Sequence, residues 1–182
     1  TMAVTEPIYP VYIDSNVMGG RAGVFENGRW SNVTYMSCNE ENKFVPQIPD
    51  HRVDMVYLCY PNNPTGMVIT KEELQKWVDY ALAHNAIIFY DAAYEAYIQD
   101  DDIPHSIYEI PNAKKVAIEF HSYSKTAGFT GIRCGYTIIP KELTATTKDG
   151  KCVEVAQYWD RRQCTKFNGT SYISQSAAAA IY

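Results

Sequence analysis

Three polar clusters in this 182-residue chain contain side chains that could carry out chemistry, and each cluster closely follows an apolar segment. Together they contain amides, a carboxylate, a phenol, hydroxyls and an amine: Asn62, Asn63, Asp91, Tyr94, Ser122, Ser124 and Lys125. A guanidinium, that of Arg133, follows eight residues after the last of them. An amine and a guanidinium at one site would suit a ligand that carries both a carbonyl group and negative charge.

Each type of side chain matches one part of a single cofactor, pyridoxal phosphate. The Lys125 amine can form a Schiff base with an aldehyde, and the Asp91 carboxylate can keep a pyridine nitrogen protonated, which makes the ring an electron sink. Asn63 and Tyr94 can both hydrogen-bond a ring oxygen. The two serine hydroxyls of the third cluster and the guanidinium of Arg133 suit a phosphate dianion. The clusters therefore predict pyridoxal phosphate as the cofactor.

Four short apolar segments, rich in strand-forming residues, are predicted to form a sheet: Val53–Tyr60, Ala86–Tyr90, Val116–Phe120 and Cys134–Ile139. They are mostly apolar rather than alternating, which is typical of a mainly parallel sheet covered on both faces by helices. In such a sheet, ligands bind beyond the carboxyl ends of the strands. We therefore expect the three polar clusters to meet at one edge of an α/β fold, a three-layer αβα sandwich.

One helix is predicted between the first two of these strands. Thr70 followed by Glu73 is the pattern of a capping box at a helix N-terminus, and Asn85 marks the expected end of the helix. Apolar residues between these positions recur at helical spacing on one face: Leu74, Trp77, Val78, Ala81 and Leu82. This spacing indicates a helix that buries one face against the sheet.

The segments on either side of this region carry weaker patterns. Ile8–Asp14 and Asn32–Cys38 are interpreted as further strands, Thr144–Lys151 as a polar loop, and the alanine-rich stretch from Ser174 as a helix. This last helix runs to Tyr182 without a glycine, a proline or a basic last turn to end it. We therefore expect the chain to be part of a longer protein.

Each cluster also has an interpretation that involves no ligand. Residues 62–66 favour a turn, Asp91 could cap a helix, Tyr94 could be a packing residue, and Lys125 could be a solvated surface lysine. Arg133 could form half of an ordinary salt bridge. These interpretations are independent of one another, whereas a single site would account for all the positions together.

Composition and charge argue against several classes of protein. The net charge of -5 argues against a nucleic-acid binder, and no apolar stretch reaches the roughly 18–20 residues of a membrane helix. The N-terminal residues lack the basic and apolar pattern of a signal peptide. The five cysteines form no CxxC pair and the four histidines show no metal-ligand spacing, so no metal site is predicted. A reduced, cytoplasmic location fits this cysteine pattern best.

Four motifs resemble, in order and spacing, those of the class I and II aminotransferases of fold type I. They are Asn63–Gly66, Asp91–Tyr94, Ser122–Lys125 and Arg133. The resemblance runs through the whole chain. It implies that residues 1–182 form part of the large, pyridoxal phosphate-binding domain of such an enzyme. The N-terminal segment and the C-terminal small domain of the family would be missing, so the chain alone would be inactive.

The resemblance implies the same roles for the clusters as their chemistry does. The catalytic residues would be Lys125, Asp91 and Tyr94, and Lys125 would also move a proton between the substrate α-carbon and the cofactor. The complete set of cofactor-binding residues would be Tyr9, Asn63, Asp91, Tyr94, Ser122, Ser124, Lys125 and Arg133.

Two of the residues implied by the resemblance lie outside the clusters. Tyr9 would stack its ring on the cofactor. Asn168 would reach into the neighbouring subunit's site, which implies a homodimer. Tyr9, Asn63 and Asn168 would contact the substrate. Taken by itself, Asn168 also fits a turn before Gly169.

Within the family, three segments resemble the LL-diaminopimelate aminotransferases: Tyr9–Ser15, Ser124–Arg133 and Lys166–Ser171. This resemblance implies transamination of LL-2,6-diaminopimelate with 2-oxoglutarate, an amino acid and a 2-oxo acid, in lysine biosynthesis. Three alternatives stay open at this point, because fold alone does not fix activity. They are another aminotransferase, acting on aspartate or aromatic amino acids, a carbon–sulfur lyase with the same cofactor, and an aminotransferase-like sensor domain of a transcriptional regulator.

Overall fold

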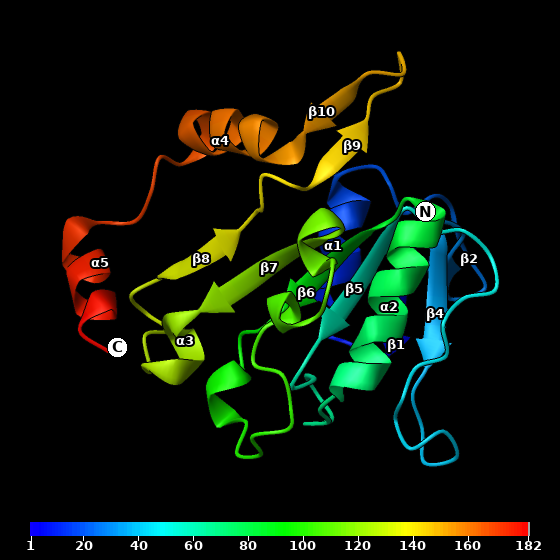
Figure 1. Ribbon diagram of the computed structural model, residues 1–182, viewed down its shortest axis with the longest axis horizontal. Helices are drawn as coiled ribbons and strands as arrows, with labels where there is room; N and C mark the ends of the chain where they lie inside the picture. Colours follow the sequence, from blue (N-terminus) through cyan, green and yellow to red (C-terminus); the bar gives the residue numbers. More distant parts are fainter. Residues whose placement is uncertain (182) are drawn as a thin grey trace.

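A six-stranded sheet with the strand order β4-β1-β5-β6-β7-β8 forms the centre of the structure, a computed structural model that describes residues 1–181 (Figure 1). Its strands are β1 (Met2–Glu6), β4 (Val33–Ser37), β5 (Met55–Cys59), β6 (Ile87–Asp91), β7 (Ala117–Ser122) and β8 (Gly135–Ile138). All neighbouring strands pair in parallel except β7 and β8, which are antiparallel. The five strands expected at the positions of β4 to β8 are therefore confirmed, as is the mainly parallel sheet.

Helices lie on both faces of the sheet, with α2 (Lys71–His84) in front of it and α1 (Val11–Met18) behind it in Figure 1. On the α2 face, Trp77 packs with Leu58 and Ile88 in the larger hydrophobic core. On the α1 face, partly buried apolar residues of α1 pack against β1 and β4 in a smaller core. The predicted arrangement of a sheet between helical layers is thus confirmed.

The predicted helix α2 begins and ends at the expected residues. The Thr70 hydroxyl accepts a hydrogen bond from the Glu73 backbone N–H at 3.2 Å, and the Thr70 N–H donates to the Glu73 carboxylate at 3.3 Å. This reciprocal pair is the predicted capping box. At the other end, Asn85 adopts the left-handed conformation, with φ of 52°. Asparagine tolerates this conformation better than most residues, so it ends the helix.

The interpretation of Ile8–Asp14 as a strand is wrong, because the helix α1 begins at Val11. Pro10 precedes its first turn in the helical conformation, and its carbonyl oxygen accepts hydrogen bonds from the N–H groups of Ile13 and Asp14. Proline is well suited to the start of a helix, because its fixed φ is helical and its missing N–H would have no partner there. The buried strand β1, which precedes this helix, had not been predicted.

The C-terminal part of the chain also differs from expectation. Thr144–Lys151 was expected to be a loop, but β9 (Thr144–Thr146) pairs with β10 (Cys152–Glu154) in an antiparallel hairpin. Only the residues between these strands form the turn, in which Gly150 has φ of +81°. The strands follow from the alternation of small and β-branched residues on either side of this turn, which the polar composition concealed.

Two further helices follow this hairpin, α4 (Val155–Lys166), which had not been predicted, and α5 (Tyr172–Ala179). The helix expected from Ser174 onward is therefore confirmed as α5, while its expected last residue, Tyr182, lies outside the described residues. The remaining short elements are β2 (Phe25–Glu26), β3 (Arg29–Trp30), α3 (Tyr123–Thr126) and the 3-10 turns Glu95–Tyr97, Ile107–Glu109 and Ala113–Lys115. None of the helices within residues 1–181 is long and apolar enough to span a membrane.

Candidate active site

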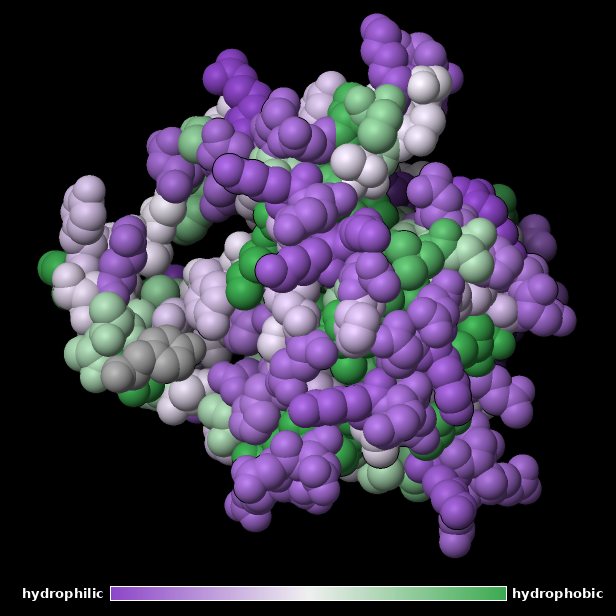
Figure 2. All heavy atoms as spheres, viewed as in Figure 1, coloured by the Kyte–Doolittle hydropathy of each residue, from purple (hydrophilic) through white to green (hydrophobic). Residues whose placement is uncertain are grey.

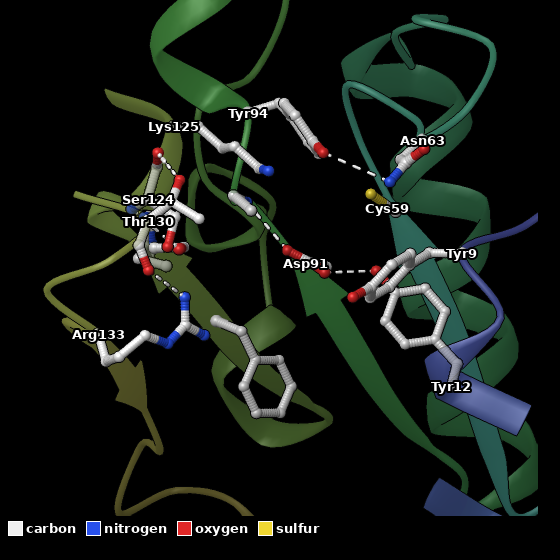
Figure 3. A pocket seen from close by; sticks show the side chains of 14 residues that line it. Tyr9, Tyr12, Cys59, Asn63, Asp91, Tyr94, Ser124, Lys125, Thr130 and Arg133 are labelled. Atoms are coloured by element: carbon white, nitrogen blue, oxygen red, sulfur yellow. Dashed lines mark hydrogen bonds between the residues drawn. The ribbon is translucent and has the colours of Figure 1, made fainter. Parts of the chain in front are cut away.

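A pocket of about 370 Å³ opens at the edge of the sheet where β5, β6 and β7 end (Figure 3). Eight of the residues singled out in the sequence line it: Tyr9, Asn63, Asp91, Tyr94, Ser122, Ser124, Lys125 and Arg133. The three polar clusters thus meet at one edge because the strands that precede them run in parallel. The volume lies within the range of small-molecule sites.

Asp91 is the last residue of β6, and a hydrogen bond reaches each of its carboxylate oxygens. Oδ1 accepts from the Ala93 backbone N–H at 3.0 Å, and Oδ2 accepts from the Tyr12 hydroxyl. Each oxygen keeps a further lone pair for another donor. Asp91 does not cap a helix, because the next helical turn begins only at Glu95. Its bond with the Ala93 N–H is a local turn contact.

Tyr12 lines the pocket but was not among the residues selected from the sequence. Burial raises the pKa of its phenol far above the usual value, and the neighbouring Asp91 carboxylate raises it further. The phenol therefore stays protonated and acts as a donor. The signal was present in the spacing, since Tyr9 and Tyr12 are one helical turn apart, but a strand would have placed them on opposite faces. Because the segment is helical, their rings meet edge to face with centroids 5.7 Å apart.

Asn63 and Tyr94 contact each other across the pocket. The Asn63 amide donates to the Tyr94 hydroxyl at 3.3 Å, which leaves the phenolic proton free for another acceptor (Figure 3). The turn interpretation of the first cluster is also correct, since the Gly66 N–H donates to the Asn62 carbonyl oxygen at 2.7 Å. The Asn62 side chain donates to Thr65 and does not line the pocket, so only Asn63 of this pair faces it.

Lys125 lies in the short helix α3, which the Ser122 hydroxyl caps by accepting from the Ser124 N–H at 3.2 Å. The Lys125 Nζ lies 5.5 Å from the centre of the Tyr94 ring. Its backbone carbonyl oxygen accepts from the Tyr97 hydroxyl at 3.1 Å, which fixes the main chain at this position. Within the described part of the chain Lys125 forms no ion pair, so its amine is available to a ligand.

Arg133 reaches the pocket from the loop after α3. Its backbone is in the left-handed region, with φ of 61°, and its guanidinium donates to the Thr130 carbonyl oxygen at 2.6 Å. Among residues 1–181 the guanidinium has no carboxylate partner, so the salt-bridge interpretation is not supported. The Thr130 hydroxyl donates to the Ser124 carbonyl oxygen at 3.1 Å. Thr130, which sequence reasoning missed, lies with Ser124 and Arg133 on one side of the pocket (Figure 3), and Ser122 also lines it.

A thiol also lines the pocket, that of Cys59 at the end of β5. Burial, and secondly the Asp91 charge, raise the pKa of the Cys59 thiol to about 12, so the thiol is neutral. All five cysteines of the chain are free. No group of three or more His, Cys, Asp or Glu side chains that could hold a metal ion occurs in the described residues.

Asn168, to which the family resemblance gives a role in the partner's site, does not line the pocket of its own chain. It lies just after α4, exposed and in the left-handed conformation with φ of 69°, and its N–H donates to the Gln163 carbonyl oxygen. This geometry fits the turn interpretation. In this position the side-chain amide lies outside the chain's own pocket.

Comparison with known families defines the wider class of the protein. The sequence profile of the family described as aminotransferase class I and II matches residues 34–182. The chain belongs to the class I and II aminotransferases. The matched region of this aminotransferase chain contains all three polar clusters and Arg133, while Tyr9 and Tyr12 precede it.

Curated relatives match this aminotransferase chain along its whole length. It is 70% identical over 182 residues to the LL-diaminopimelate aminotransferase of Phocaeicola vulgatus, and 59% identical over 182 residues to that of Prochlorococcus marinus subsp. pastoris. The alignments cover all of this chain but only 44% and 45% of those proteins. The chain thus spans less than half the length of the curated relatives it matches.

Solved structures agree with the fold of the aminotransferase chain. The L,L-diaminopimelate aminotransferase from Chlamydomonas reinhardtii aligns with a TM-score of 0.87 and 44% identity, over 96% of this chain and 42% of that one. Aspartate aminotransferase from Thermotoga maritima aligns with a TM-score of 0.77 over 97% of this chain and 43% of that one, and at 24% identity this likeness shows the fold alone. The predicted fold-type I architecture is confirmed.

Proposed function

We propose that this chain supplies the pyridoxal phosphate site of an LL-diaminopimelate aminotransferase, which exchanges amino groups between LL-2,6-diaminopimelate and 2-oxoglutarate in lysine biosynthesis. The observation that carries the proposal is the 70% identity, over every residue of the chain, to a relative of that name. The matched region includes the segments around Lys125 and Asn168, whose sequences resemble those of this subfamily.

The groups that line the pocket fit the cofactor. An unpaired amine, a carboxylate with free lone pairs, an amide and phenol pair, and a guanidinium with three hydroxyls surround one cavity. When bound, pyridoxal phosphate supplies an aldehyde that reacts with amines and a protonated ring that withdraws electrons from the substrate α-carbon. The pocket therefore offers one group for each part of that molecule. We also propose that the chain belongs to the large, cofactor-binding domain of the enzyme.

In this proposal the chain's own residues bind the cofactor and move protons. Among the described residues Lys125 supplies the one amine that lines the pocket, and its Nζ would hold the aldehyde and transfer the proton of the substrate α-carbon. The Asp91 carboxylate would keep a proton on the pyridine nitrogen, and Asn63 and Tyr94 would donate to the ring oxygen. Arg133 would hold the phosphate with the serine hydroxyls, since the guanidinium has no competing carboxylate among the described residues.

The proposal extends to the assembly and the location of the enzyme. We propose a homodimer in which Asn168 serves the partner's site. Two features support this: the exposed position of Asn168, and the fact that its own chain's pocket does not include it. A dimer with two-fold symmetry would place the same contact at both sites. A reducing, cytoplasmic compartment is also proposed, since all five thiols are free.

The test uses the complete product of the gene that encodes this chain. Glutamate formation from 2-oxoglutarate is measured with LL-2,6-diaminopimelate, aspartate or phenylalanine as the amino donor. We expect LL-2,6-diaminopimelate to be the preferred donor by a large margin. Preference for aspartate or phenylalanine would replace the proposed substrate, and cleavage of carbon–sulfur substrates without amino transfer would replace the reaction.

The site itself is tested by Lys125→Ala, with Lys114→Ala as the matched control. Lys114 is an exposed lysine outside the pocket. We expect Lys125→Ala to abolish glutamate formation and the visible absorption of the bound cofactor, because no other amine lines the pocket. Lys114→Ala should retain both. Normal turnover in the Lys125→Ala enzyme would contradict the assignment of the site.

A further inference from the structure

The carboxylate of Asp91 is held by two elements that are far apart in the sequence. The turn that follows β6 supplies the Ala93 N–H to Oδ1, and the helix α1 supplies the Tyr12 hydroxyl to Oδ2. A carboxylate held through one oxygen could still rotate about its last bond. With a donor on each oxygen its plane is fixed, and the remaining lone pairs have a defined direction.

Tyr12 is itself held by an aromatic column, which consists of Tyr12, Tyr57, Phe89 and Phe120. Tyr12 stacks on Tyr57 with ring centroids 5.2 Å apart and an interplanar angle of 19°. Tyr57 stacks on Phe89 at 5.0 Å and 14°, and Phe89 lies 5.9 Å from Phe120 at 15°. The column crosses β5, β6 and β7 on the face of the sheet where α1 lies, so three strands fix the plane of the Tyr12 ring.

A buried amide connects the helix to this column. Asn16 is 3% exposed, and its Nδ2 donates both to the Tyr12 carbonyl oxygen at 2.8 Å and to the Tyr57 hydroxyl at 2.9 Å. The two bonds join the backbone of α1 to the second ring of the column. The position of the Tyr12 hydroxyl is therefore set by packing on one side and by hydrogen bonds on the other.

The Tyr12 phenol is a donor of fixed protonation state. Burial, and then the Asp91 charge, raise the pKa of the phenol far above its usual value. A neutral phenol next to a carboxylate donates its proton to the shared hydrogen bond and adds no charge to the site. The bond to Asp91 Oδ2 should therefore persist across the pH range in which an enzyme of this class works.

We propose that Tyr12 is a positioning residue that acts through Asp91, its hydroxyl turning the carboxylate so that the free lone pairs face the pyridine nitrogen of the bound cofactor. The inference rests on the proposed function, because it requires pyridoxal phosphate in the pocket. It assigns to α1 a role beyond covering the sheet. In this proposal the Tyr12 hydroxyl contacts Asp91 and not the cofactor or the substrate, so it acts only by orienting the carboxylate.

The hydroxyl can be separated from the ring by two matched substitutions. Tyr12→Phe keeps the stacked ring and removes only the donor to Asp91. Tyr57→Phe removes a hydroxyl from the same column, one that accepts from Asn16 and does not reach Asp91. Both variants are made in the complete gene product. Three quantities are measured for each variant. They are the affinity of the cofactor-free protein for pyridoxal phosphate, the pH midpoint of the visible absorption of the bound cofactor, and the melting temperature of the cofactor-free protein.

We expect Tyr12→Phe to weaken pyridoxal phosphate binding about tenfold, as for the loss of one hydrogen bond to a charged group. The pH midpoint should rise by about half a unit, because a less firmly held proton on the pyridine nitrogen leaves the ring less electron-withdrawing. Tyr57→Phe keeps the stacked ring and the bond from Asn16 to the Tyr12 carbonyl oxygen, so it should change affinity and midpoint much less than Tyr12→Phe does. The melting temperatures of the two variants should be similar.

Three outcomes would overturn the inference. The first is a Tyr12→Phe protein with wild-type affinity and midpoint, which would make Tyr12 a packing residue only. The second is an equal loss of affinity in both variants, which would point to the column as a whole. The third is a fall in the melting temperature of Tyr12→Phe alone without a change of midpoint. If Lys125→Ala also leaves the absorption of the bound cofactor unchanged, the failure lies with the proposed function instead.

Discussion

The sheet region, residues 1–138, and the C-terminal arm, residues 139–181, bury very different shares of their apolar side chains. In the sheet region α2 alone buries five residues, Trp77 among them. In the arm α4 buries none, and Tyr172 and Ile173 at the start of α5 are 85% and 84% exposed. Figure 2 shows an open gap between the arm and the sheet, with pale and green residues around α5 at the left.

This difference separates helices that the chain supports by itself from helices that need other contacts. The apolar face of α2 packs on β5 and β6, so its spacing is visible in the sequence and predicts its bounds. The exposed apolar residues of the arm have no such surface among the described residues. Isolated helices of this length are marginal in water. The arm is therefore expected to depend on surfaces beyond those of this sheet.

The largest expected effect lies at the pocket edge of the sheet region, at Asp91. Asp91→Asn removes the negative charge that would hold a proton on the cofactor ring, so turnover should fall by several orders of magnitude while the fold is kept. The measurement is steady-state turnover of the complete gene product, with its melting temperature. Asp79→Asn, an exposed position on α2, serves as the matched control. Near-normal turnover of Asp91→Asn would show that Asp91 only stabilises the turn after β6.

The contrast in burial itself is tested by one substitution in each region. Trp77→Ala should lower the free energy of unfolding by about 3–5 kcal/mol, since it leaves a cavity in the larger core. Tyr158→Ala, in α4, should change it by no more than about 0.5 kcal/mol, because this tyrosine is 62% exposed. Urea unfolding of the 182-residue chain measures both. A cost at Tyr158 close to that at Trp77 would show that the arm is packed in solution.

The role of the arm in assembly is tested by mixing Asn168→Ala subunits with Lys125→Ala subunits. If Asn168 serves the partner's site, both lesions of a mixed dimer fall in the same site and the other site is wild type. Activity should then return above the level of either parent. We expect Asn168→Ala alone to lower activity about tenfold, as for one lost hydrogen bond to a substrate.

The mixing experiment requires that both parent dimers have little activity and that mixed dimers are isolated with two different affinity tags. If Asn168 serves its own chain instead, every site of a mixed dimer carries one lesion. Verified mixed dimers without recovery would therefore count against the interface role. A mixture of wild-type and Lys125→Ala subunits supplies the reference for one working site per dimer.

The smallest expected effect comes from matched helix caps in the two regions. The Thr70 hydroxyl accepts from the Glu73 N–H, and the Ser171 hydroxyl accepts from the Ser174 N–H at 3.2 Å. Thr70→Ala should lower the free energy of unfolding of the chain by about 1 kcal/mol. Ser171→Ala should only speed hydrogen exchange within α5, because a helix whose first turn is this exposed is expected to unfold locally. A shift of the urea midpoint by Ser171→Ala would show instead that α5 unfolds together with the sheet region.

Much of the sheet region could be predicted because its signals are local. The capping box at Thr70, the apolar spacing of α2 and the mostly apolar strands each depend on a few neighbouring residues. The meeting of the polar clusters at one edge then followed from the parallel direction of the strands. The cluster residues that line the pocket were therefore accessible from pattern alone, whereas Tyr9 was selected only through the family resemblance, and the roles of all of them stay predictions.

What could not be predicted depends on contacts between distant segments. Ile8–Asp14 fits a strand in isolation, and only its packing on the sheet shows that Pro10 begins a helix. The same error concealed Tyr12, whose contact with Asp91 joins residues far apart in the chain. Thr130 lines the pocket because of the path of the loop after α3, which no periodic pattern describes. In the arm, α4 has no buried face and therefore no clear spacing.

The position of β1 has a consequence for the order in which the sheet can form. Although β1 comes first in the chain, it is an interior strand that pairs with β4 on one side and β5 on the other. β1 can pair with β4 once the chain up to Ser37 has been synthesised, but both strands join the rest of the sheet only after β5, which ends at Cys59. In a protein that lost residues 2–6, the single strand β4 would be separated from the four strands β5 to β8, and the newly unpaired edges of β4 and β5 would be available for pairing between molecules.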